Sequence, residues 1–242
     1  MVTSHGNEKD EATGTAVLFS AGLDSAVLLA DAASRGPAWP LYVSVGLAWE
    51  AAELETARAL LASPPFAGRV PPVAALRFAM DDIYPPTHWA IRGVPPAYDT
   101  PDEDVYLTGR NLVLLAKAGT WCAQHGVARI ALGPLAGNPF PDATPEFFAA
   151  TARALSLGLA RPIEIVTPFR ALHKDAVIER GFALGVPFAL TLSCMNPQTA
   201  PPGNPSPYLH CGACSKCRER LDAFRDVGRE DPAGYVDGRR GA

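Results

Sequence analysis

The stretch AVLFSAGLDSAVLLA, residues 16–30, constrains the fold more than any other part of the chain. Four strand-forming residues, 16–19, run into the turn Ser-Ala-Gly-Leu-Asp-Ser and then directly into an apolar pattern of helical period. A strand that turns tightly into a helix directs peptide N–H groups and the positive end of the helix dipole at one place. The sequence therefore predicts an anion site at residues 20–25.

Strand-like and helix-like segments alternate along the rest of the chain. The predicted strands lie within residues 16–19, 40–48, 73–80, 128–134 and 163–168, and the predicted helices within 24–35, 49–62, 110–126, 144–158 and 173–185. Such alternation requires parallel pairing through crossover helices, which predicts an α/β fold with a doubly wound, mostly parallel sheet. Ligands of these sheets bind beyond the carboxyl ends of the strands. The segments expected at those ends are 20–25, 108–111, 133–142 and 167–174.

Composition narrows the class of protein. The 242 residues are 48% hydrophobic and 19% charged, enough for one full core with an appended module. No apolar run approaches the roughly 18 residues of a membrane span. The first 14 residues are polar, which predicts a disordered tail without a secretory signal and a cytoplasmic protein. A net charge of −4 without a basic stripe argues against nucleic acid as the main ligand.

The cysteines indicate a metal site. Cys194 is followed, after sixteen residues, by Cys211, Cys214 and Cys217 in the pattern C-x2-C-x2-C. Four thiolates at this spacing are typical of a closed, tetrahedral structural zinc site, and an iron–sulfur cluster is the main alternative. Cys122 lies on an apolar helix face and is expected to be a buried thiol. An odd number of cysteines in a chain without a signal peptide is typical of a reducing compartment.

The turn at residues 20–25 is not a Walker A loop, because it lacks that spacing. It resembles the S-G-G-x-D-S loop of the PP-loop ATP pyrophosphatases, with Ala21 in place of the second Gly. The methyl group of Ala21 would narrow the approach to phosphate unless its φ is negative. The alternative is a plain strand–turn–helix in which Asp24 only caps the helix. The expected ATP-binding residues of this loop are Ser20, Ala21, Gly22, Leu23, Asp24 and Ser25.

Further segments extend the resemblance. TGRN at 108–111 is similar to the P-G-R-N segment of the QueC family, the 7-cyano-7-deazaguanine synthases, and GNPFPDATPEFF at 137–148 is similar to its G-Y-P-D-x-x-x-E-F segment. Residues 155–178, the cysteine segment and EDPAGY at 230–235 follow the same family, so the resemblance covers about 15–236. It implies a PP-loop ATP-binding domain of the HUP type over 15–190 and a small helical zinc-binding segment with its tail over 191–242.

The resemblance also implies a reaction. A QueC enzyme adenylates 7-carboxy-7-deazaguanine with ATP and Mg²⁺, and ammonia then gives the amide and finally the nitrile; the family's members commonly form homodimers. The residues to which this assigns catalysis are Asp24, Arg110 and Lys174, and those that would also bind ligand are Gly109, Arg110, Asn111 and Asp142. Three alternatives stay open: Lys174 as a solvated surface lysine, Arg110 as a surface arginine at the start of a helix, and Asp142 as the cap of the helix that starts near Thr144.

One segment departs from the family. After the second strand the family reads D-Y-G-Q-x-H, whereas this chain reads VGLAWEAAELE. A QueC-like enzyme that adenylates a substrate for another acceptor, such as a protein amine, is therefore a second hypothesis. A third hypothesis is a tRNA sulfur-transfer enzyme, which would need a catalytic cysteine pair and a basic surface. A fourth is a zinc-stabilised ATP sensor, which would bind ATP without releasing pyrophosphate.

Overall fold

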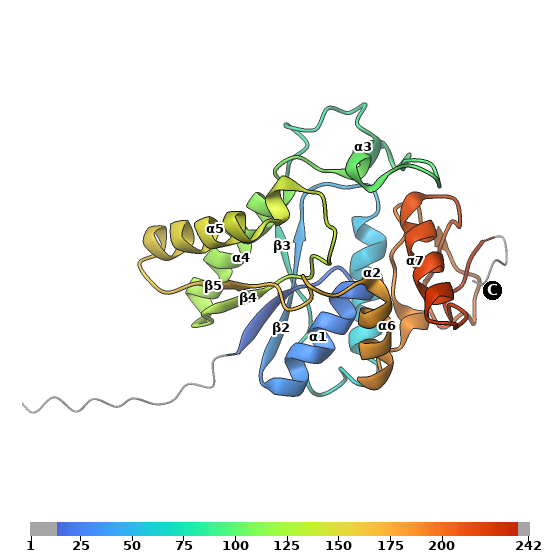
Figure 1. Ribbon diagram of the computed structural model, residues 1–242, viewed down its shortest axis with the longest axis horizontal. Coiled ribbons are helices and arrows are strands. Elements are labelled where there is room, and N and C mark those ends of the chain that lie inside the picture. The colour runs from blue at the N-terminus through green and yellow to red at the C-terminus, as the bar shows by residue number, and fades with distance from the viewer. Residues whose placement is uncertain (1–13, 237–242) are drawn as a thin grey trace, which may run out of the picture.

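The computed structural model describes residues 14–236, in which a parallel sheet lies between two layers of helices (Figure 1). The strands of the sheet are β1 (Thr15–Leu18), β2 (Ala38–Ser44), β3 (Ala74–Arg77), β4 (Arg129–Ala131) and β5 (Glu164–Val166). The helices are α1 (Leu23–Arg35), α2 (Glu50–Leu61), α3 (Trp89–Arg92), α4 (Arg110–His125), α5 (Pro145–Gly158), α6 (Lys174–Ala183) and α7 (Ser215–Asp226). None of these helices is long and apolar enough to cross a membrane. The predicted tail, 1–14, lies outside the described residues except for Gly14.

The sheet confirms the predicted fold class. Its five strands run in the order β3-β2-β1-β4-β5, and every neighbouring pair is parallel. From β1 the chain winds outward to β2 and β3, and then returns to the other side of β1 for β4 and β5. This reversal creates a crevice at the carboxyl end of β1, where ligands of doubly wound sheets bind. The predicted anion loop begins at the same end.

Alternate side chains of β1 enter different cores. Val17 packs with α1 and α6 on one face of the sheet, whereas its neighbour Ala16 packs with α4 and β4 on the other face. The period of two in a strand produces this division. In Figure 1, α4 and α5 accordingly lie on one side of the sheet and α1, α6 and α7 on the other. Cys122 of α4 is fully buried in the second core, as predicted.

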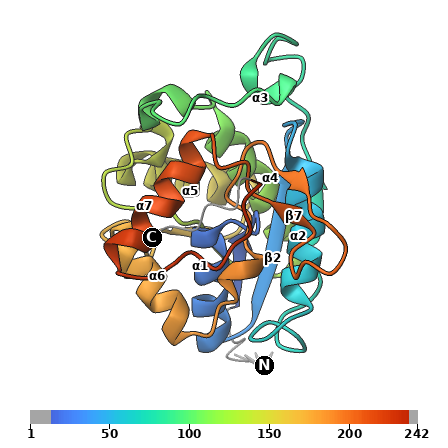
Figure 2. The same cartoon turned by 90° about the vertical axis from the view of Figure 1, so that its right-hand side faces the viewer.

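The chain beyond α6 forms a cap over the carboxyl ends of the strands. It contains α7 and a short antiparallel hairpin, β6 (Gln198–Thr199) and β7 (Tyr208–Leu209), which face the viewer in Figure 2. Arg220 of α7 is buried and donates two hydrogen bonds, of 2.7 and 2.9 Å, to Asp231. Asp231 also accepts a 2.6 Å hydrogen bond from the hydroxyl of Tyr235. This network attaches the last described segment to α7.

Removing the charge of Asp231 tests this network. We expect Asp231→Asn to lower the free energy of unfolding by about 3–5 kcal/mol, because Arg220 would remain buried without a counter-ion. Asp222→Asn, on the same helix, breaks only an exposed ion pair with Arg225 and should cost less than about 1 kcal/mol. Urea unfolding of both variants measures the difference. Equal small losses would contradict the structural importance of the Arg220–Asp231 pair.

Candidate active site

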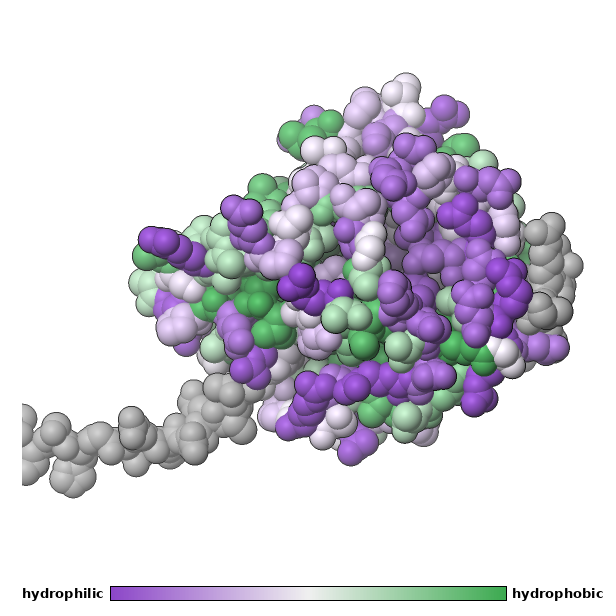
Figure 3. Space-filling view, in the orientation of Figure 1, coloured by the Kyte–Doolittle hydropathy of each residue, from purple (hydrophilic) through white to green (hydrophobic). Residues whose placement is uncertain are grey.

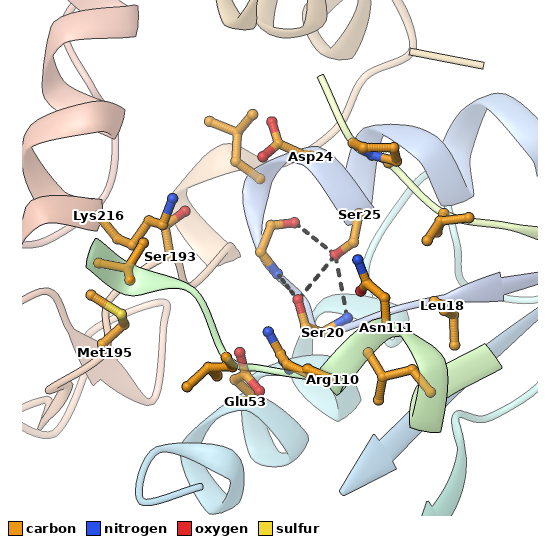
Figure 4. A pocket seen from close by; sticks show the side chains of 18 of the residues that line it. Leu18, Ser20, Asp24, Ser25, Glu53, Arg110, Asn111, Ser193, Met195 and Lys216 are labelled. Atoms are coloured by element: carbon orange, nitrogen blue, oxygen red, sulfur yellow. Dashed lines mark hydrogen bonds between the residues drawn. The ribbon is translucent and has the colours of Figure 1, made fainter. Parts of the chain in front are cut away.

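A cavity of about 370 Å³ opens at the carboxyl ends of β1, β2 and β4. On the face shown in Figure 3, hydrophilic residues cluster over α7 and around a recess beside it. Figure 4 shows side chains that line the cavity. The predicted nucleotide- and substrate-binding residues that line it are Ser20, Gly22, Leu23, Asp24, Ser25, Arg110, Asn111, Asp142 and Lys174. Two predicted residues of that kind, Ala21 and Gly109, are not among the lining residues, and of the predicted metal ligands only Cys194 is.

The loop between β1 and α1 is held by its own serines. The Ser25 hydroxyl donates to the carbonyl of Gly22 at 3.0 Å and accepts from the peptide N–H of Ser20 at 3.3 Å. The first backbone bond of α1 runs from Ala26 to Gly22, so the preceding N–H groups have no acceptor within the helix. These N–H groups and the helix dipole make the loop a suitable phosphate site, as its sequence predicts.

Ala21 occupies a backbone conformation that favours glycine. Its φ is +60°, a left-handed value that costs a residue with a Cβ roughly 1–2 kcal/mol. The negative φ under which the methyl group of Ala21 would not narrow the approach to phosphate is therefore absent. Ala21 is fully buried, however, and it is not among the residues that line the cavity. The carbonyl of Ala21 accepts a 2.9 Å hydrogen bond from Leu192, which joins the loop to the chain leading to the cysteines.

Lys174 lies at the start of α6 in a cluster of charges beside the loop. Its ammonium is 3.1 Å from Asp24 of α1 and forms a second ion pair with Glu219 of α7. Burial alone would lower the pKa of Lys174, but the two carboxylates outweigh it and hold the pKa above its ordinary value. Burial likewise opposes ionisation of Glu219, yet Lys174 and Lys216 lower its pKa to about 2. Lys174 is thus a partly buried, charged lysine that faces the predicted phosphate site.

The start of α4 is organised by a carboxylate from another segment. Gly109 precedes the helix with φ +76°, and Asp142 accepts a 3.1 Å hydrogen bond from the peptide N–H of Asn111. The side chain of Asn111 also donates to Asp142, at 3.3 Å. Thr144 caps α5 with its own hydroxyl, so the alternative in which Asp142 caps that helix is wrong: Asp142 caps α4. Burial raises the pKa of Asp142 although these hydrogen bonds oppose it.

A second carboxylate, missed from the sequence, lies inside the cavity. Glu53 of α2 is only 8% exposed and accepts a 2.6 Å hydrogen bond from the hydroxyl of Tyr42. Burial raises the pKa of Glu53 to about 7, against the opposing influence of Arg110. Residues 53, 57 and 60 share one helix face, and Ala57 and Leu60 are fully buried. That spacing was the available signal that Glu53 would face inward.

The four predicted metal ligands come together. The sulfur atoms of Cys194, Cys211, Cys214 and Cys217 lie within 4.8 Å of one another. The Sγ atom of Cys217 lies 3.9 Å from that of Cys211 and 3.5 Å from that of Cys214. These distances are near the ~3.8 Å edge of a tetrahedron with Zn–S bonds of about 2.3 Å. Peptide N–H groups of residues 196 and 211 donate to Cys194, as is common for metal-bound thiolates. The donor set fits one soft, tetrahedral metal ion.

The fold and the site together define a class. A strand–SAGLDS–helix unit at the switch point of a parallel sheet, with a lysine facing the loop, is the arrangement of a PP-loop ATP-using enzyme. The sequence profile described as "Queuosine biosynthesis protein QueC" matches residues 14–228. This chain belongs to the QueC family.

Curated relatives agree with the family. A protein of Methanoculleus marisnigri named 7-cyano-7-deazaguanine synthase is 33% identical over 90% of this chain and 96% of its own length. Proteins of the same name from Syntrophobacter fumaroxidans and Caldicellulosiruptor bescii are 30% and 28% identical, over 91% and 90% of this chain and 95% and 96% of their own lengths. The similarity therefore extends through both the sheet and the cysteine segment.

The raised pKa of Glu53 predicts an unusual dependence of stability on pH. A carboxyl with a folded pKa of about 7 and an ordinary value of 4.5 is penalised in the folded state once it ionises, so its contribution to stability falls as the pH rises through that window. Relative to the wild type, Glu53→Gln should therefore gain about 1–3 kcal/mol of unfolding free energy between about pH 5 and pH 8. Urea titrations measure it, with the exposed Glu55→Gln as control. A difference that does not change with pH would refute the shift.

Proposed function

We propose that this chain is an ATP-dependent carbon–nitrogen ligase that converts 7-carboxy-7-deazaguanine and ammonia into 7-cyano-7-deazaguanine. The observation that carries this proposal is the cavity in which the phosphate loop, the paired Lys174 and Arg110 face a common space. Membership of the QueC family and the name shared by the relatives support the substrate and the product.

The chemistry explains why ATP is needed. A carboxylate resists attack by ammonia, so its oxygen first attacks the α-phosphorus of ATP and pyrophosphate leaves. Ammonia then attacks the acyl carbon of the acyl-adenylate, AMP leaves, and the amide forms. A second ATP adenylates the amide oxygen, and loss of AMP and a proton leaves the nitrile. Each nitrile formed therefore requires two ATP and releases two AMP and two pyrophosphate.

Residues of the cavity suit these steps. Negative charge grows on the departing pyrophosphate, and the peptide N–H groups at the start of α1 and the ammonium of Lys174 would stabilise it. The hydroxyls of Ser20 and Ser25 keep the loop in shape. Arg110 would bind the carboxylate of the substrate, because its planar fork matches two oxygens. Asn111 and Asp142 would hold Arg110 in position by capping α4.

Asp24 is the residue we assign to Mg²⁺. One of its oxygens, Oδ2, pairs with Lys174, whereas Oδ1 is buried and has no hydrogen-bond partner among the described residues. A buried, unsatisfied carboxylate oxygen beside a phosphate loop fits a hard cation that takes oxygen ligands. The ion would neutralise charge on the phosphates, and Asp24 would orient it toward the loop.

Zinc is the metal we assign to the four cysteines. An iron–sulfur cluster places several iron and sulfide atoms between its thiolates and needs a wider cage. The short separations of the sulfurs here, 3.5 and 3.9 Å, favour a single ion instead. All four ligands are protein sulfurs, so the ion would stabilise the C-terminal segment and take no part in the chemistry. We also propose a homodimer, as the family resemblance implies.

The segment after β2 supports a second candidate. The peptide N–H groups of Val45 and Gly46 donate to Glu50, at 2.7 and 3.1 Å, so this loop is closed by its own carboxylate where the family carries Asp, Gln and His. A ligase with the same adenylation but another acceptor, such as a protein amine, would retain every contact of Lys174. Such an enzyme would form no nitrile from 7-carboxy-7-deazaguanine, ATP and ammonium.

The direct test supplies 7-carboxy-7-deazaguanine, ATP, Mg²⁺ and ammonium and measures nitrile, AMP and pyrophosphate. We expect two AMP for each nitrile. Lys174→Met should lower kcat by about 10²–10³-fold, because it removes one positive group from the transition state. Lys117→Met, on α4 outside the cavity lining, should leave kcat unchanged. Absence of nitrile with the wild type would refute the proposed reaction, and full activity of Lys174→Met would refute the role of the lysine.

The metal assignment has its own test. Elemental analysis of the purified protein should find about one zinc per chain and no iron. Removal by a chelator should lower the thermal unfolding temperature, because binding of a structural metal contributes to folding. Cys214→Ser should bind far less zinc, whereas the control Cys122→Ser, a core position outside the cluster, should keep it. Iron with sulfide in the protein would overturn the assignment.

A further inference from the structure

Glu53 has more acceptor capacity than the protein uses. An ionised carboxylate has about four acceptor sites; the hydroxyl of Tyr42 occupies one of them at 2.6 Å, and the side chain of Trp49 is a second hydrogen-bond partner. More than nine-tenths of Glu53 is buried, yet it lines the cavity. Burying a carboxylate without full hydrogen bonding is costly, so a position of this kind is typical of a group that meets donors of a ligand.

Arg110 lies beside Glu53 but does not neutralise it. In Figure 4 the side chain of Arg110 extends toward Glu53 beneath the phosphate loop. No ion pair within 4.0 Å joins Arg110 to a carboxylate of the described residues. Its Nε atom is buried and has no hydrogen-bond partner in the same part of the chain. The guanidinium of Arg110 and the carboxylate of Glu53 thus both line the cavity, and they form no hydrogen bond with each other.

On these observations, and resting on the proposed function, we infer that Glu53 binds the N1–H and 2-amino groups of the deazaguanine ring. One edge of 7-carboxy-7-deazaguanine carries, in order, the 7-carboxylate, the 6-oxo oxygen, N1–H and the 2-amino group. The first two accept hydrogen bonds and suit Arg110, and the last two donate and suit a carboxylate with two oxygens. Tyr42 would hold the carboxylate of Glu53 in the orientation this requires.

Adenine of ATP is the other source of an N–H donor. Its 6-amino group, however, has a ring nitrogen that accepts hydrogen bonds on each side, N1 on one and N7 on the other. A carboxylate that receives the amino group would face one of these lone pairs and be repelled. The guanine-like edge offers two adjacent donors, so it matches Glu53 without such a clash. The kinetic constants for the two substrates separate these cases.

The first test is Glu53→Gln, which keeps a side chain of the same size and an oxygen for Tyr42. We expect kcat/KM for 7-carboxy-7-deazaguanine to fall by about 10–100-fold, because the amide presents one acceptor and one donor to two donors. The KM for ATP should change by less than about twofold. The matched control is Glu55→Gln, on the exposed side of the same helix. An unchanged kcat/KM, or a loss confined to the KM for ATP, would overturn the inference.

The second test uses the wild-type chain and does not depend on the folding of a variant. An analogue of the substrate without the 2-amino group should lose about 10–100-fold in kcat/KM with the wild type. With Glu53→Gln the same change of substrate should cost less than about threefold, because the partner of that group is already gone. Equal losses in both proteins would show that Glu53 does not contact the 2-amino group.

Calorimetric binding of 7-carboxy-7-deazaguanine separates this inference from the proposed reaction. If the wild type binds the compound and Glu53→Gln does not, but no nitrile forms, Glu53 keeps its assignment and the reaction is wrong. If nitrile forms equally well with both proteins, the reaction stands and the assignment of Glu53 is wrong. A wild type that neither binds nor converts the compound refutes both.

Discussion

The hydrogen-bond ladders of β1 with β2 and with β4 both end where the chain turns into the loop at residues 20–25. Since the sheet order reverses there, the loops on either side diverge and leave a space that no helix fills. The first turn of α1 directs its unpaired N–H groups into that space. The hydrogen bond from Leu192 to the carbonyl of Ala21 then ties the loop to the C-terminal cap. This junction sets the position of the loop that we propose binds the nucleotide, relative to the cysteine segment.

The charged side chains of the cavity form two groups, one around Lys174 and one around Arg110. At the phosphate end, Lys174 is shared between Asp24 and Glu219, which keeps it charged and in place. In the second group, Arg110 and Glu53 both line the cavity but form no ion pair with each other, and burial raises the pKa of Glu53 to about 7. The cavity lining carries three cations, Arg110, Lys174 and Lys216, and four carboxylates, Asp24, Glu53, Asp142 and Glu219. Binding of an anionic substrate would therefore depend on where the cations and the peptide N–H groups lie, since the lining has no excess of positive charge.

The cysteine segment also shapes the site, because Cys194 lines the cavity and two other cysteines lie at the start of α7. Cys214 precedes α7 and Cys217 lies in its first turn. Glu219 follows two residues later and reaches Lys174. The register of α7 relative to the phosphate loop thus depends on how the thiolates are held. The buried pair of Arg220 and Asp231 holds the same helix about one turn further on, so α7 is constrained at both its start and its middle.

The strands, the helices α1 to α6 except the short α3, the phosphate loop and the four cysteines could be predicted because each depends on local order: period, spacing and turn chemistry. The hairpin β6–β7 is too short for such a signal. Contacts between distant segments were decided only in the tertiary structure. Asp24 and Glu219 meet through Lys174, and Asp142 caps a helix that begins before it in the chain, because the sheet order brings their elements together. The burial of Glu53, which raises its pKa, likewise results from tertiary packing and cannot be read from the local sequence. The sequence by itself determined the fold class and which ligands to expect; only packing decided which charges face them.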